Sequence, residues 1–145
     1  MVNNQQNSNE IRWITQELIK EVKKIQHLIE PEAGMYCIEK GKIGEICFIR
    51  YVSSGGVYCI EMNDGRHFGK YSSQFLKSYT VLPDLRWLVR KLRNLTDELG
   101  WDFKFGPVED GFWWVLVYDR ERNRIPFEAD TLELVCLKTF IELKK

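Results

Sequence analysis

The cysteines and histidines are the side chains of this 145-residue chain with the clearest capacity for nucleophilic chemistry, and there are four and two of them. A catalytic cysteine needs a histidine that takes its proton and a donor that holds the oxyanion. Cys59 and His67 stand on either side of an Asn-Asp-Gly turn, so a hairpin would place them on neighbouring strands. No third group or catalytic motif accompanies them. We therefore expect no catalytic residue, and a small enzyme whose site is assembled from distant segments is the second alternative.

The spacing of the cysteines also bears on metal and redox chemistry. Cys37, Cys47, Cys59 and Cys136 contain no Cys-x-x-Cys pair, and their separations from the two histidines fit no zinc pattern. The sequence has no glycine-rich phosphate loop and no metalloprotease motif. We expect buried free thiols, no metal and no cofactor.

A cluster of cations in the middle of the chain could bind nucleic acid. The chain has 21 basic and 21 acidic side chains, but residues 64–93 hold seven and two of them. Arginines at four- and three-residue spacing share one face of a helix, where they can reach successive phosphates while a neighbouring tryptophan stacks on a base. A solvated helix face explains the same spacing and is the more common case. Binding of DNA or RNA is thus the first alternative, through Lys70, Lys77, Arg86, Trp87, Arg90, Lys91 and Arg93.

Two apolar patterns could bind another protein instead. One is a helical stripe in the first third of the chain, and the other is the β-type stretch "FWWVLVY", which is apolar on both faces. Such a strand needs cover on both sides, and in a chain of this size we favour cover from the chain itself over cover from a partner. The candidate protein-binding residues are Ile11, Ile14, Leu18, Val22, Ile25, Trp114, Leu116 and Tyr118.

The first stripe predicts an amphipathic helix over residues 9–33. Apolar residues recur every three or four positions from Ile11 to Ile29, and Pro31 ends the pattern. Ser8 or Asn9 can cap its start by accepting a hydrogen bond from a free backbone N–H. Residues 1–8 are expected to form a disordered tail.

Residues 34–82 have the pattern of a small β-structure. Five short runs rich in β-branched and aromatic residues are separated by turns that contain glycine. We expect five strands that curl into a small closed or half-closed barrel, because a sheet of this size gains stability by burying one face.

The segment "GKYSSQFL" in this region resembles the turn that joins the fourth and fifth strands of SH3-like barrels. Ser72 stands where that family has proline, and the residues that match its signature in kind are Gly69, Tyr71, Ser73, Phe75 and Leu76. The resemblance implies an SH3-like fold with a single 3₁₀ turn before the last strand, but not the family's proline-rich ligands, since the aromatic groove is lacking. Tyr71 and Phe75, four residues apart around the turn, are both expected to reach the interior.

Residues 83–145 predict a helix, three strands and a second helix. Pro83 suits the first turn of a helix, and leucines recur on one face until Gly100 ends it. Asp130, followed three residues later by Glu133, resembles a capping box at the start of the closing helix.

These patterns together predict an α+β protein with an N-terminal amphipathic helix, an SH3-like five-stranded small barrel and a C-terminal αβββα unit. With 44% hydrophobic and 29% charged residues the chain is too apolar for intrinsic disorder, and no apolar run is long enough for a membrane helix. We expect a cytoplasmic, non-catalytic accessory or adaptor protein that binds another protein or a second copy of itself. We do not expect it to bind a membrane.

Overall fold

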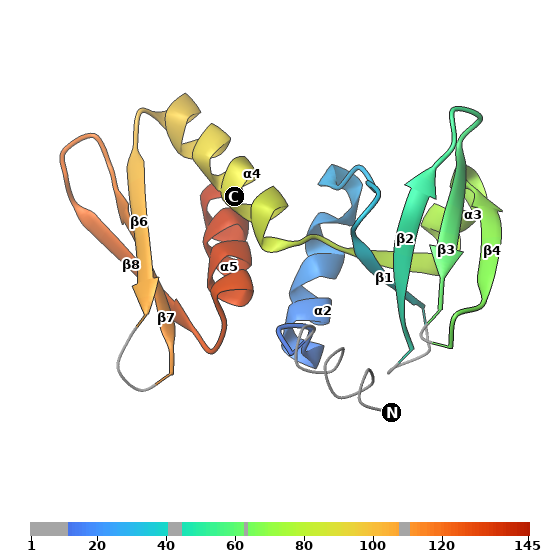
Figure 1. Cartoon of the computed structure of the whole chain (residues 1–145). Coiled ribbons are helices and arrows are strands. Elements are labelled where there is room, and N and C mark those ends of the chain that lie inside the picture. Colours follow the sequence, from blue (N-terminus) through green and yellow to red (C-terminus); the bar gives the residue numbers. More distant parts are fainter. Residues whose placement is uncertain (1–11, 41–44, 63, 108–110) are drawn as a thin grey trace. The chain divides into compact units, whose positions relative to one another are not determined.

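The computed structural model describes residues 12–40, 45–62, 64–107 and 111–145. Within these residues the protein is α+β, as the sequence predicts, with two antiparallel sheets of five and three strands (Figure 1). The chain divides into two compact units. We call residues Val22–Asp84 the five-stranded unit, and residues 12–21 with Leu85–Lys145 the three-stranded unit.

The N-terminal helix is present but shorter than predicted, and it changes type along its length. The α-helix α2 spans Gln16–Val22 and the 3₁₀ helix η1 spans Lys23–Leu28, with Ile25 outside helical geometry at φ −122° and ψ 16°. Next to this break, Gln26 Nε2 donates to the carbonyl of Val81 at 2.8 Å, and Gln26 Oε1 accepts from the N–H of Val81 at 2.9 Å. These bonds to a distant strand compete with a continuous helix, which a local pattern does not reveal.

The start of this helix is capped by a residue that the sequence did not single out. Thr15 Oγ1 accepts a hydrogen bond from the backbone N–H of Leu18 at 3.2 Å, which satisfies one of the donors that a helix start leaves free. The predicted caps Ser8 and Asn9 lie outside the described residues, as does Ile11.

The five-stranded unit contains one antiparallel sheet with the strand order β4-β3-β2-β1-β5. The strands are Tyr36–Glu39 (β1), Ile46–Val52 (β2), Val57–Glu61 (β3), His67–Tyr71 (β4) and Tyr79–Leu82 (β5). Five strands were predicted, but β4 and β5 are the two edges and do not pair with each other in the described residues, so a closed barrel is not confirmed. The backbone of β5 bonds to the side chain of Gln26 in η1 instead.

The connection from β4 to β5 is longer than the single 3₁₀ turn that the SH3-like resemblance implies. It is the α-helix α3, Ser72–Ser78. Phe75 on this helix is fully buried, as predicted, and its ring stacks on Tyr79 with 5.2 Å between centroids. Tyr71 was also predicted to lie inside, and this is wrong because 64% of it is exposed. Tyr71 still belongs to strand β4, where alternation turns its side chain away from the face that bears Tyr58, the second ring against Phe75.

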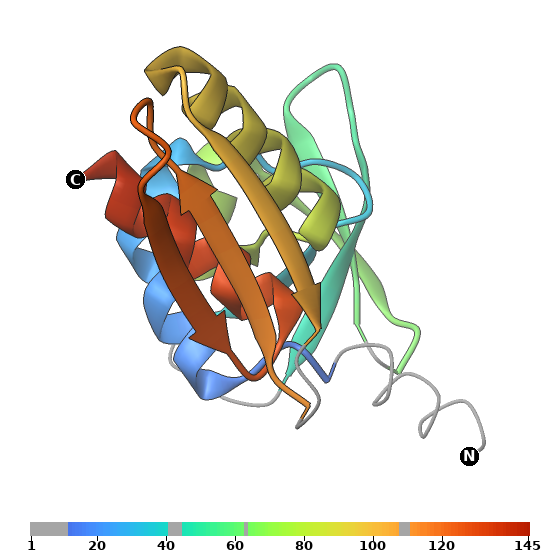
Figure 2. The ribbon, with the colours of Figure 1, turned by 90° about the vertical axis from the view of Figure 1, so that its left-hand side faces the viewer.

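The three-stranded unit has the αβββα order that the sequence predicts. Its elements are α4 (Leu85–Leu99), β6 (Asp102–Pro107), β7 (Trp113–Tyr118), β8 (Arg124–Ala129) and α5 (Leu132–Lys144). The strand order is β6-β7-β8, and both helices lie on one face of the sheet (Figure 2). Val115 and Val117 of the central strand are fully buried on that face. The opposite face, which the viewer sees in Figure 2, has no helix of this unit over it among the described residues.

Candidate protein-binding surface

The predicted nucleic-acid residues divide between the two units. Arg86, Arg90 and Arg93 are exposed on α4, whereas Lys70 on β4 and Lys77 on α3 belong to the five-stranded unit. The arginines therefore share one helix face as predicted.

Trp87 does not fit the predicted role of stacking on a base. It is only 2% exposed and lies edge-on to Phe140 of α5, with 6.1 Å between ring centroids. Nζ of Lys91 lies 5.5 Å from the centre of the Trp87 ring. A nucleotide cannot reach this ring without opening the core of the unit. The sequence did contain a signal of this burial, because Trp87 is adjacent to Leu88, which lies on the leucine face of α4.

The apolar stripe on the N-terminal helix has little exposed surface among the described residues. Leu18, Val22 and Ile25 are buried, and Ile14 is half-buried. Buried apolar side chains of this kind commonly contribute to the core of a protein. The prediction that they bind another protein remains a prediction.

The remaining candidates, Trp114, Leu116 and Tyr118, lie in a row on β7, on the face of the sheet opposite α4 and α5. We call this face the outer face. All three side chains are half-buried. Strand register defines their neighbours, because paired residues point to the same side of a sheet. The neighbours are Gly106 and Glu128 beside Trp114, Lys104 and Pro126 beside Leu116, and Asp102 and Arg124 beside Tyr118.

The ring of Trp114 is fixed in position by β6. A Cβ atom on Gly106 would lie 2.8 Å from Cζ2 of Trp114, so the indole rests directly over a residue that has no side chain. The indole Nε1 donates to the carbonyl oxygen of Pro107 at 3.2 Å. Trp114 is therefore held across the sheet before any partner binds, which reduces the entropy that binding must overcome.

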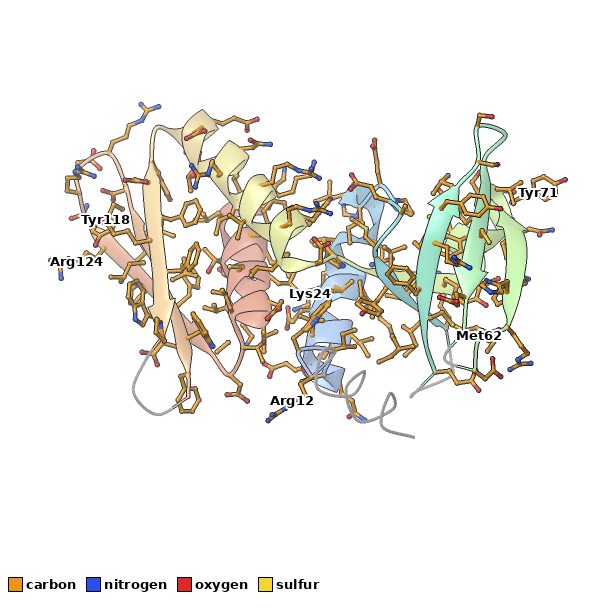
Figure 3. The ribbon with its side chains drawn as sticks, in the orientation of Figure 1. Arg12, Lys24, Met62, Tyr71, Tyr118 and Arg124 are labelled. Carbon is orange, nitrogen blue, oxygen red and sulfur yellow. The ribbon has the colours of Figure 1, made fainter. Side chains whose placement is uncertain are left out.

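The Tyr118 end of the row is a hollow surrounded mainly by cations. Its volume is about 310 Å³, and its lining residues are Asp102, Lys104, Tyr118, Arg122 and Arg124. Nζ of Lys104 lies 5.9 Å from the centre of the Tyr118 ring. Figure 3 shows Tyr118 and Arg124 on the side of the sheet away from α4 and α5. Sequence analysis missed Lys104, Arg122 and Arg124, because only the hairpin register brings them beside Tyr118.

The thiols and histidines are not arranged for nucleophilic catalysis. Burial raises the pKa of Cys37 and Cys47 above the usual range and that of Cys136 to about 12, so at neutral pH these thiols stay protonated. Cys59 stands opposite Gly69 rather than His67.

His67 pairs across the hairpin with a carboxylate and not with a thiol. It stands opposite Glu61, whose Oε1 lies 3.7 Å from its Nε2. Nη1 of Arg50 lies 3.9 Å from the same carboxylate oxygen, and the side chains of Arg50, Glu61 and His67 are all well exposed to solvent. The three therefore form a polar surface cluster.

The structure offers neither a metal cluster nor a membrane-spanning helix among the residues that it describes. Among the described residues no group of three or more His, Cys, Asp and Glu side chains could hold a metal ion. Over the same part of the chain, no helix combines the length and the hydropathy needed to cross a bilayer.

Comparison of the chain with models of protein families, with curated proteins and with solved structures gave no match.

Proposed function

We propose that this protein is a non-catalytic binding module, an accessory or adaptor, that holds another protein on the outer face of its three-stranded sheet. The observation that carries this is the row Trp114, Leu116 and Tyr118 on β7. Central strands of antiparallel sheets commonly have one solvated, polar face, but here that face is apolar. Aromatic side chains at the centre and charged residues at the rim are the usual composition of a protein interface.

The neighbouring strands support the same role. Lys104 on β6 and Arg124 and Glu128 on β8 surround the apolar row with charge. Tryptophan and tyrosine supply much contact area at a low cost in side-chain entropy, and they dominate the binding energy of many interfaces. We expect Trp114 to be the main anchor, because its ring is already fixed over Gly106.

The test uses peptides, since the partner is not identified. Random 12-residue peptides displayed on phage are selected on the full-length protein, and the affinities of selected peptides are measured by fluorescence anisotropy. We expect Trp114→Ala to weaken binding by about 30-fold, the effect of losing an anchor worth about 2 kcal/mol. The matched control is Tyr71→Ala, which removes an exposed aromatic ring from the other unit. Peptides that bind Trp114→Ala and the unchanged protein equally well would refute the proposed surface.

A specific observation also favours a second function, the binding of nucleic acid by α4. Arg86, Arg90 and Arg93 are exposed on one face of this helix. We expect labelled single- and double-stranded DNA and RNA to show affinity that falls steeply between low and physiological salt, and that falls further in the double variant Arg90→Glu, Arg93→Glu. Anisotropy that stays unchanged at low salt would exclude this function.

We also propose that the protein acts in the cytoplasm. All four cysteines are free, and three of them are buried in the cores of the two units. Free buried thiols are typical of proteins kept in a reducing compartment.

A further inference from the structure

We propose that the hollow at the Tyr118 end of the outer face binds carboxylate side chains of the partner, so that the bound segment is a peptide with an apolar part and one acidic end. This inference rests on the proposed function, because it concerns the same surface. It goes further in naming the chemistry of the partner and the end of the row at which the acidic part of the bound segment lies.

The charges around the hollow carry the first step. Lys104, Arg122 and Arg124 are three cations, and Asp102 is the one carboxylate among the lining residues. Asp102 Oδ1 already accepts a hydrogen bond from the backbone N–H of Phe103 at 2.8 Å. The lining residues of the hollow therefore have an excess of positive charge, and their three cationic side chains are exposed, which suits a carboxylate.

The backbone of Arg122 gives a second indication. Its φ is 66°, and it is the one non-glycine residue with positive φ in the part of the chain that the structure describes. It lies in the β7–β8 hairpin, where the N–H of Arg122 donates to the carbonyl of Asp119 at 3.0 Å and the N–H of Asn123 donates to Asp119 Oδ1 at 2.9 Å. Glycine is the residue best suited to such a position. The chain nevertheless has arginine at this position, although its backbone conformation favours glycine. The arginine side chain supplies a guanidinium group to the hollow.

The other end of the row decides between a peptide and a nucleic acid. Glu128 on β8 stands beside Trp114. Trp114 precedes Tyr118 by four residues on β7, which corresponds to about 13 Å at the usual rise of a strand. A nucleic-acid strand lying along the row carries a phosphate on every nucleotide and would meet this carboxylate. A peptide can place apolar side chains on Trp114 and Leu116 and carboxylates only at the Tyr118 end. The charges of the outer face thus complement a peptide that is acidic at one end.

The test has two arms. In the first, the short probe acetyl-tetraglutamate amide is titrated into ¹⁵N-labelled full-length protein, and we expect the largest amide shifts at Lys104, Arg122 and Arg124. In the second, the phage-selected peptides are sequenced and are expected to be enriched in Asp and Glu at one end. Their affinity should fall at least about tenfold in Arg122→Glu, Arg124→Glu. The control Arg90→Glu, Arg93→Glu makes the same change in net charge on α4 and should change the affinity less than about twofold.

A further variant separates loss of binding from loss of the fold. Arg122→Gly removes the guanidinium but suits the positive φ, so the midpoint of thermal unfolding should stay the same or rise while the affinity for tetraglutamate falls. An Arg122→Gly variant that stays folded and binds tetraglutamate as tightly as the unchanged protein would contradict the assignment of Arg122 as a contact residue.

The outcomes distinguish this inference from the proposed function. If selected peptides need Trp114 but carry no acidic end and bind Arg122→Glu, Arg124→Glu normally, the carboxylate site is refuted and the protein-binding surface stands. Suppose instead that tetraglutamate shifts the amide signals of the residues around the hollow, that Arg122→Glu, Arg124→Glu abolishes those shifts, and that no selected peptide needs Trp114. The carboxylate site then stands and the proposed function fails. If a 12-nucleotide oligo(dT) shifts the same amides at lower concentration than tetraglutamate, the partner is a nucleic acid and the inference is overturned.

Discussion

Replacement of Phe75 by alanine is expected to lower the free energy of unfolding of the five-stranded unit by about 3–5 kcal/mol, the usual cost of removing a buried aromatic ring. Phe75 is fully buried, its ring stacks on Tyr79 at an interplanar angle of 9°, and it lies 4.6 Å from the centre of Tyr58. The truncation would leave a cavity between α3 and the sheet. The contacts between aromatic rings would be lost together with the buried area.

The measurement is urea unfolding followed by far-ultraviolet circular dichroism, with Leu76→Ala as the matched control. Leu76 is the next residue on α3 and is 49% exposed, so its truncation should change the free energy of unfolding by no more than about 0.5 kcal/mol. All five tryptophans lie in the three-stranded unit, so their fluorescence follows that unit separately. Equal urea midpoints for Phe75→Ala and Leu76→Ala would show that Phe75 is not the core residue that the structure makes it.

Phe75 and Tyr71 show how far the sequence predicts the middle of this protein. Glycine turns and β-branched runs correctly indicated five strands, since these signals are local. The connection could not be predicted as precisely, because "SSQF" is a short helical start whose length depends on Leu76, Lys77 and Ser78 joining it. The position of Tyr71 depended on where β4 ends, and a shift of one residue in a strand reverses the side to which every side chain points.

Helix ends show the same limit at both ends of the chain. Asp130 was predicted to cap the closing helix, but the cap is Thr131, whose Oγ1 accepts from the N–H of Leu134 at 3.2 Å. Both residues are good caps, so composition alone does not choose between them. The break at Ile25 depends on bonds from Gln26 to a strand 55 residues away.

The candidate site was predictable in its apolar part and not in its charged part. The stretch "FWWVLVY" already indicated a strand with two apolar faces, and Trp114, Leu116 and Tyr118 follow from its alternation. The cations beside them lie on two other strands and a hairpin. These cations lie beside the apolar row because Asp102 of β6 and Arg124 of β8 both pair with Tyr118. The lengths of the two turns between the strands determine this register.

Replacement of Trp87 by alanine is the second large effect that we expect, a loss of about 3–5 kcal/mol in the stability of the three-stranded unit. Trp87 is 2% exposed and packs edge-on against Phe140, so it joins α4 to α5. Trp87→Phe keeps a ring against Phe140 and should lose clearly less stability. Urea unfolding followed by circular dichroism measures both variants, because tryptophan fluorescence would itself change with the substitution.

This result also bears on the function of α4. If Trp87 stacked on a base, its truncation would leave stability unchanged and would weaken the binding of oligonucleotides, so unchanged stability of Trp87→Ala would contradict the structure. Arg93→Ala is the control on the same helix, because Arg93 is exposed and its truncation should change the free energy of unfolding by no more than about 0.5 kcal/mol. Any affinity of α4 for nucleic acid must then come from its cationic side chains, Arg86, Arg90, Lys91 and Arg93. Such binding is electrostatic and has little sequence preference. The outer face instead offers a tryptophan ring held over Gly106, with charges at defined positions beside the apolar row, and such an arrangement favours selective recognition.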